Sequence, residues 1–136
     1  MADELETMIH IYFTTADKGV RNAFAGTGQS RKRSTVITRV LAERLFDKLA
    51  INYTWMKYGV EVPKQEVINF INDVLWAVPD DIAKLSGNRT VGSEAATKSI
   101  THGLFLAMQL EYNRKFESQD PWDPASPRYI HREKQA

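Results

Sequence analysis

Residues 25–58, AGTGQSRKRSTVITRVLAERLFDKLAINYTWMKY, decide the fold that the sequence predicts. A short loop with Gly26 and Gly28 leads into three consecutive cations, and a long amphipathic segment follows. Between residues 31 and 57, seven cations oppose two carboxylates, so this segment carries a net charge of +5 within a chain of net charge +1. The rest of the chain therefore sums to −4, and the charge is unevenly distributed along the sequence.

The amphipathic part of this stretch predicts one long helix. Ser34 or Thr35 can cap the free N–H groups at its start, and apolar side chains recur at helical spacing as far as Tyr58. At about 1.5 Å per residue, a helix over residues 34–58 is about 37 Å long, enough to span a domain of this size. We expect Gly59 to end it.

The same spacing of apolar residues predicts further helices over residues 3–24, 63–78 and 93–116, with a short connecting helix at residues 82–85. In the first of these, a β-branched run leaves a strand over residues 10–14 open as the alternative. The sequence thus predicts an all-α fold, a bundle of four main helices with one short connecting helix. A chain of 136 residues is long enough to bury one compact core.

The helical spacing stops near residue 117, where prolines at positions 121, 124 and 127 space out an extended segment. We expect residues 1–116 to form the helical bundle domain and residues 117–136 to form an extended C-terminal arm. Trp122 and Tyr129 are the large apolar groups of this arm, so they are its candidate contacts to a partner.

Composition excludes several classes of site. The chain contains no cysteine, which rules out disulfides, thiolate zinc sites and a cysteine nucleophile. The acidic start of the sequence does not resemble a secretory signal, and no stretch approaches about 18 uninterrupted apolar residues. We expect a cytoplasmic protein that does not associate with a membrane.

Motif spacing gives enzymatic chemistry no support. The three histidines lie far apart, and neither the zinc-protease spacing nor the di-iron spacing of Glu and His occurs. A metal shared by Glu6 and His10, one helical turn apart, is the alternative to ordinary, partly buried histidines. We expect no catalytic residue, no metal and no cofactor.

The glycine loop and the cations after it are typical of a phosphate site. A helix N-terminus offers free N–H groups and positive partial charge, and glycines let an anion approach the backbone. The specific dinucleotide and nucleotide-hydrolase loop motifs are absent, so a solvated basic turn is the alternative. The predicted anion-binding residues here are Gly26, Gly28, Ser30, Arg31, Lys32, Arg33, Arg39 and Arg44.

A second loop, residues 86–92, repeats this chemistry directly ahead of the last helix, where Ser93 is the expected cap. Arg89 is its candidate anion contact. The two arginine loops could converge on one polyanion, either within a monomer or across a subunit boundary. An ordinary capped helix start is the alternative for this loop.

Nucleic acid is the ligand class most easily reached from the +5 segment, because Lys and Arg contacts to phosphates give affinity that does not depend on base sequence. No helix-turn-helix arrangement with a basic reading helix is expected. Tyr53, Trp55 and Tyr58 could stack on bases, but their spacing favours core and rim positions. The sequence predicts a small, non-enzymatic protein that binds nucleic-acid phosphates.

Two alternatives remain open. The chain could be a homo-oligomeric assembly or interaction protein that uses its helices and C-terminal arm, because small residues at positions 95, 96, 99, 103 and 107 form a line along the last helix. It could also bind a small nucleotide between the two arginine loops.

Overall fold

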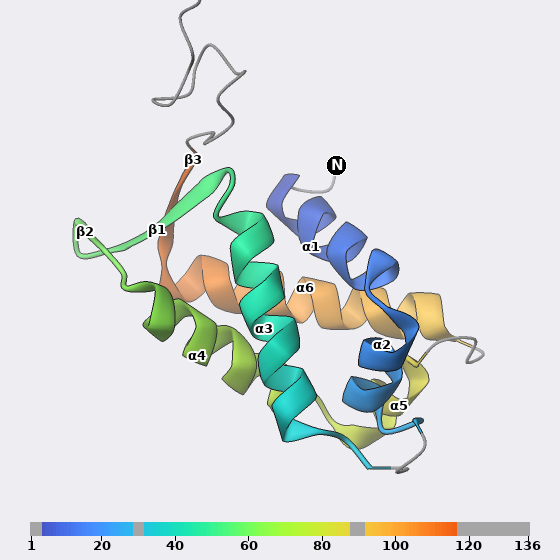
Figure 1. Ribbon diagram of the computed structural model, residues 1–136. Coiled ribbons are helices and arrows are strands. Elements are labelled where there is room, and N and C mark those ends of the chain that lie inside the picture. Colours follow the sequence, from blue (N-terminus) through green and yellow to red (C-terminus); the bar gives the residue numbers. More distant parts are fainter. Residues whose placement is uncertain (1–3, 29–31, 88–91, 117–136) are drawn as a thin grey trace, which may run out of the picture.

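The computed structural model describes residues 4–28, 32–87 and 92–116, and within these ranges the chain is mainly helical (Figure 1). The helices are α1 (Glu4–Thr15), α2 (Lys18–Ala25), α3 (Thr35–Leu49), α4 (Lys64–Trp76), α5 (Asp80–Leu85) and α6 (Ser93–Glu111). The strands are β1 (Tyr53–Lys57), β2 (Val60–Glu61) and β3 (Asn113–Phe116), which form an antiparallel sheet of order β2-β1-β3. The predicted mainly helical character is confirmed, but the sequence did not predict the sheet.

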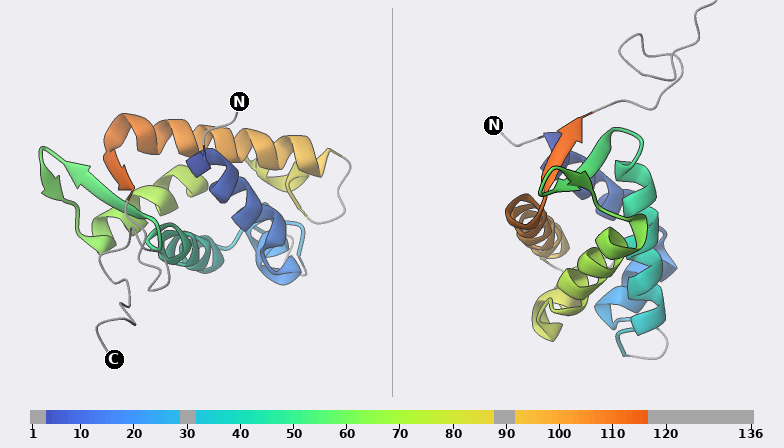
Figure 2. Two further views of the ribbon diagram at one scale, coloured as in Figure 1. Left: turned by 90° about the horizontal axis from the view of Figure 1, so that it is seen from above. Right: turned by 90° about the vertical axis from the view of Figure 1, so that its left-hand side faces the viewer.

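The four longest helices supply most of the core. In Figure 2, α3 and α6 lie on opposite sides of the molecule, and α1 and α4 each pack against both of them. The side chains that meet there are fully buried, and they include Leu5, Ile9, Leu41, Leu45, Ile71, Leu75, Leu104 and Met108. The sheet lies at the end of the molecule where α3 and α6 end (Figure 1).

The predicted first helix, residues 3–24, is in fact two helices. The side chain of Asp17 caps α2, because its Oδ1 accepts a hydrogen bond from the backbone N–H of Gly19 at 2.8 Å. Just before it, the hydroxyl of Thr15 donates to the carbonyl of Ile11, one turn earlier in α1, at 2.7 Å. These side-chain hydrogen bonds compete with a continuous helix, and the alternative strand over residues 10–14 is also absent from this described segment.

The predicted helix over residues 34–58 is correct at its start and wrong at its end. Ser34 is the cap, since its Oγ accepts a hydrogen bond from the backbone N–H of Ile37 at 3.1 Å. The helix ends at Leu49, however, and Tyr53 and Trp55 belong to β1, where they are only 5% and 3% exposed. Alternate burial along this segment is the period of a strand.

The predicted last helix is shorter for the same reason. Tyr112 has extended backbone angles and ends α6, so that β3 can pair with β1. In this pairing Tyr53 lies opposite Phe116, and their rings meet edge to face with centroids 5.7 Å apart. Gly92, in the left-handed conformation, takes the capping position that we expected for Ser93.

Gly59 belongs to a hairpin turn and not to a helix end. Tyr58 and Gly59 have φ angles of 53° and 76°. The two-residue turn that fits the twist of a hairpin requires positive φ at both of its central residues. On the strand before the turn, Lys57 donates a hydrogen bond to the carboxylate of Glu111 on α6, and this bond raises the pKa of Lys57. The hairpin is thereby tied to the end of the last helix.

Substitution of Gly59 distinguishes the hairpin from the predicted helix. We expect Gly59→Ala to lower the free energy of unfolding by about 1 kcal/mol, because the left-handed conformation strains any residue with a Cβ. The matched control is Gly103→Ala within α6, which should raise it by about 0.5 kcal/mol. No described atom lies within 4 Å of a Cβ at either position, so the contrast reports backbone conformation alone. Equal effects in urea denaturation would contradict this turn.

Candidate functional site

The side chain of Arg33, which the sequence predicts to contact an anion, is held by hydrogen bonds to other residues of the same chain. Its side chain is 8% exposed, and its guanidinium donates to four backbone carbonyls: Nε to Phe24 at 3.0 Å, Nη2 to Leu75 at 2.9 Å, and Nη1 to Val78 at 2.7 Å and to Trp76 at 3.4 Å. Nη1 also lies 3.1 Å from the carboxylate of Asp80. One side chain therefore joins the end of α2, the end of α4 and the start of α5.

Two aromatic rings hold the guanidinium from the sides. Its Cζ lies 4.9 Å from the ring centroid of Phe24 and 4.8 Å from that of Trp76. Arginine suits this position because a planar, delocalised cation stacks on rings while its edge donates hydrogen bonds. Arg33 thus fixes the orientation of Trp76.

A cleft of about 470 Å³, which we call the Gly26 cleft, opens beside this arrangement. The turn after α2 forms one side, and the end of α4 together with α5 forms the other. Three cations oppose one carboxylate along its walls, so the lining carries a net charge of +2. The residues that line it are Ala25, Gly26, Thr27, Lys32, Arg33, Trp76, Asp80 and Lys84.

Gly26 is required for the shape of the cleft. It ends α2 in the left-handed conformation, with a φ of 82°, and its N–H donates to the carbonyl of Asn22. A Cβ at this position would lie 3.1 Å from Cγ and 3.3 Å from the backbone nitrogen of Arg33. Glycine therefore lets the chain fold back closely enough for Arg33 to reach the helix ends.

The residues predicted for anion binding and for partner contacts divide into three groups. Gly26, Lys32 and Arg33 line the same cleft, and Gly28 lies two residues beyond Gly26 in the turn. Ser30, Arg31, Arg89, Trp122 and Tyr129 lie outside the described residues.

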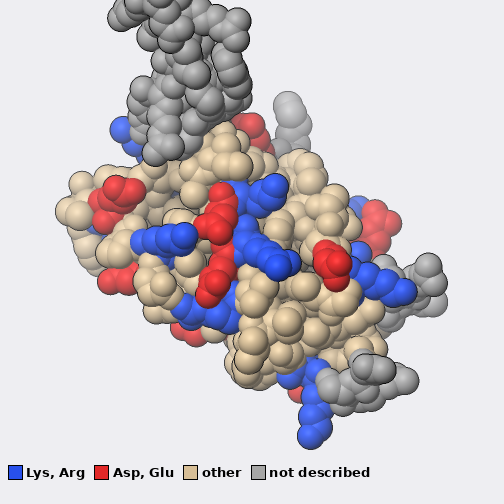
Figure 3. Space-filling view, in the orientation of Figure 1, with Lys and Arg blue, Asp and Glu red and all other residues tan. Residues whose placement is uncertain are grey.

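Arg39 and Arg44 form the third group, which lies on α3 away from the cleft lining. Arg39 pairs with Glu43 at 3.3 Å and donates to Oδ1 of Asn69 at 2.7 Å. Figure 3 shows cations and carboxylates mixed over this face of the molecule, so the segment of net charge +5 does not form a continuous positive surface there.

Two residues of the cleft were missed by sequence reasoning. Trp76 is 41% exposed, and it follows Leu75 of the buried stripe directly, so helical geometry places it on a different side of α4. A tryptophan outside an apolar stripe, close to a charged loop, is the signal that could have identified it. Lys84 lies on α5, and no feature of the sequence relates it to Lys32.

The two glycine loops meet at their described ends. A Cβ at Gly87 would lie 2.6 Å from Oγ1 of Thr27, so the start of the second loop packs directly against the first. Nη2 of Arg21 donates to the carbonyl of Ser86 at 3.3 Å and to Oγ of Ser93 at 3.4 Å, and it thereby bridges the two ends of the second loop.

The described part of the chain contains neither a metal-binding cluster nor a membrane-spanning helix. No three His, Asp or Glu side chains there are grouped closely enough to hold a metal ion, and Glu6 contacts His102 instead of His10. None of the helices described is both long and apolar enough to cross a membrane. Comparison with protein-family models, with curated proteins and with solved structures finds no match.

Replacement of Arg33 tests its structural role. We expect Arg33→Lys to lower the free energy of unfolding by about 2 kcal/mol or more, because lysine keeps the charge but lacks the planar fork that reaches several carbonyls at once. Arg39→Lys is the matched control, since it changes an exposed pair and should cost about 0.5 kcal/mol or less. Chemical denaturation measures both, and similar losses in the two variants would refute the assignment.

Proposed function

We propose that this protein binds single-stranded nucleic acid without catalysing a reaction, and that the Gly26 cleft holds one nucleotide of the strand. The observation that carries the proposal is the combination, around one cleft of about 470 Å³, of an exposed tryptophan ring and two lysines. A cleft of this volume falls within the range of about 300–1,000 Å³ that is usual for small-molecule sites.

The phosphate would be bound by Lys32 and Lys84. They reach the cleft from separate segments, one from the turn before α3 and the other from α5. Because Asp80 is paired with Arg33, the carboxylate of the lining is already engaged with a cation. The lining thus brings two lysine side chains, from different segments, to the same cleft.

The base would stack on Trp76. Base stacking on an aromatic side chain contributes about 1–3 kcal/mol and tolerates any base, because every base has a flat face. The contact with Arg33 holds the indole in place, so less conformational freedom is lost when a base stacks on it. Affinity without strong sequence preference is the expected result.

We propose that the strand continues past the cleft on the side where the described ends of the two glycine loops meet. Thr27 and Gly87 bring the described ends of these loops together. In the sequence, Arg31 directly precedes Lys32, and Arg89 follows Gly87 by two residues. We propose these two arginines as contacts to neighbouring phosphates, whereas Arg39 and Arg44 are not needed for the cleft.

Titration of a fluorescent oligothymidylate or oligouridylate tests the phosphate contacts. We expect the double variant Lys32→Ala/Lys84→Ala to bind at least about tenfold more weakly. Its slope of log K against log salt concentration should be smaller by about 1.4, since each single-strand phosphate contact contributes about 0.7. Trp76→Leu should lose about fivefold or more in affinity with an unchanged slope.

The control is Lys18→Ala/Lys48→Ala, which removes the same charge outside the cleft lining. Equal losses in the two double variants, or no binding by the unaltered chain at about 50 mM salt, would overturn the proposal. A mononucleotide that binds as tightly as the oligonucleotide would assign the same cleft to a free nucleotide.

A second candidate, self-assembly, is favoured by a separate groove of about 330 Å³ between α6 and the end of α4 with α5. Its lining is mainly apolar, and it includes Ser99 and Gly103 from the line of small residues on α6. The Cβ position of Gly103 meets no described atom within 4 Å, so the small residue leaves open space instead of packing a helix of the same chain. A second copy could fill this space.

Sedimentation velocity tests this candidate. We expect the unaltered chain to sediment above its monomer mass of 15.5 kDa at high concentration, and Ser99→Arg to sediment as a monomer, because it places a charge in the groove. A chain ending at residue 117 measures the separate contribution of the arm with Trp122 and Tyr129. A monomer at every concentration would exclude self-assembly.

A further inference from the structure

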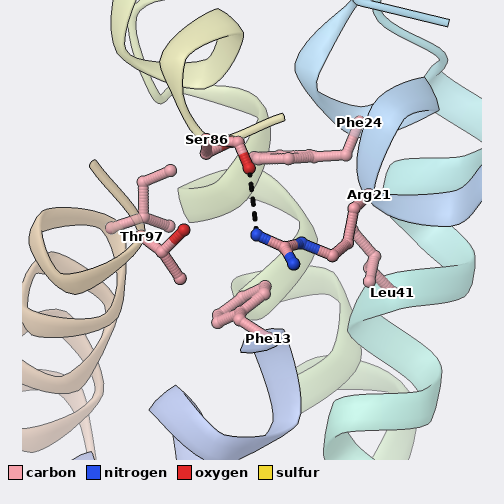
Figure 4. A pocket seen from close by; sticks show the side chains of 7 residues that line it. Phe13, Arg21, Phe24, Leu41, Ser86 and Thr97 are labelled. Atoms are coloured by element: carbon pink, nitrogen blue, oxygen red, sulfur yellow. Dashed lines mark hydrogen bonds between the residues drawn. The ribbon is translucent and has the colours of Figure 1, made fainter. Parts of the chain in front are cut away.

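A small cavity, partly open to solvent, lies between α2 and α6 (Figure 4). About 20 Å³ of it is open to the centre of a water molecule, which is room for one water-sized species. Most of its lining is apolar and comes from side chains of α1, α2, α3 and α6. The polar residues of the lining are Arg21, Ser86 and Thr97.

Arg21 brings a positive charge to this cavity without a carboxylate to balance it. Its hydrogen bonds to Ser86 and Ser93 are long, come from the same nitrogen and end on neutral oxygens. It forms no ion pair with any carboxylate in the described residues. The adjoining segments 29–31 and 88–91 contain no Asp or Glu in their sequence. Arg21 is partly buried and its charge borders a mainly apolar lining, so an opposite charge there would be favourable.

Thr97 adds a second unsatisfied group to the same cavity. The residue is 4% exposed, and its Oγ1 is buried without a hydrogen-bond partner among the described residues. Figure 4 shows this hydroxyl on the side that faces the guanidinium of Arg21. A hydroxyl and a guanidinium can both donate, so a species that only accepts hydrogen bonds would satisfy both.

We propose that this cavity binds one monatomic anion, chloride being the probe and the expected ligand, between the guanidinium of Arg21 and the hydroxyl of Thr97. The space for a water-sized centre, about 20 Å³, suits a monatomic anion better than the larger sulfate or phosphate. The anion would neutralise Arg21 and join α2 to α6 beside the second glycine loop. The site is separate from the Gly26 cleft, and it stands whether or not the chain binds nucleic acid.

Thermal unfolding in sodium chloride and in sodium gluconate at equal ionic strength tests the site. Because chloride would bind the folded state alone, we expect a saturable rise of about 4 °C or more in Tm with chloride, with bromide acting similarly. Thr97→Val and Arg21→Gln should each remove most of this rise. Thr101→Val is the matched control and should retain it, since Thr101 is another buried, unpartnered hydroxyl on α6 that does not line the cavity.

Anomalous scattering from crystals of the unaltered chain grown in bromide locates the ion directly and does not depend on how well the variants fold. The expected result is a bromide peak between Arg21 and Thr97. A cavity that holds only water, a Tm that is independent of the sodium salt, or a chloride effect that Thr97→Val and Arg21→Gln both retain would overturn the proposal.

Discussion

The last carbonyls of a helix have no partner within it, and in this protein one arginine satisfies several of them at once. The guanidinium of Arg33 meets the carbonyls at the ends of α2 and α4, where the helix dipoles also favour a positive charge. Several hydrogen bonds, two aromatic contacts and the nearby carboxylate of Asp80 offset the cost of placing a charge in a largely buried position. The walls of the Gly26 cleft are these same helix ends, so the arginine that shapes the cleft also stabilises the fold.

Apolar spacing predicted the helical segments well where one period was unambiguous. Residues 64–76 and 80–85 are helical close to the predicted bounds, since Pro63 and Pro79 mark their starts. Near Tyr53 and Trp55 the spacing is compatible with both a helix and a strand, and the sequence nearby does not decide between them. Pairing with Phe116 and its neighbours, about sixty positions away, decides it in favour of a strand.

The site, like the fold, could be predicted only where its residues are close together in the sequence. Gly26, Lys32 and Arg33 could be predicted together because they are close in sequence, whereas Trp76 and Lys84 enter the cleft from other elements. A count of cations also does not reveal whether a guanidinium faces solvent or donates to backbone carbonyls. The guanidinium of Arg33 donates to carbonyls. Arg39 and Arg44 lie further along α3, beyond its first turn, and neither of them lines the cleft.

The wall of the cleft that α5 provides is lightly attached to the core. Of its six residues only Ala83 is buried, Ile82 is partly buried against the core, and the first turn is tethered through the exposed Asp80. A segment with so few apolar contacts can open at a small fraction of the free energy of global unfolding. If the Gly26 cleft binds a strand as proposed, the strand would leave through brief detachment of α5, with residence times set by this local opening, while the four long helices keep their packing.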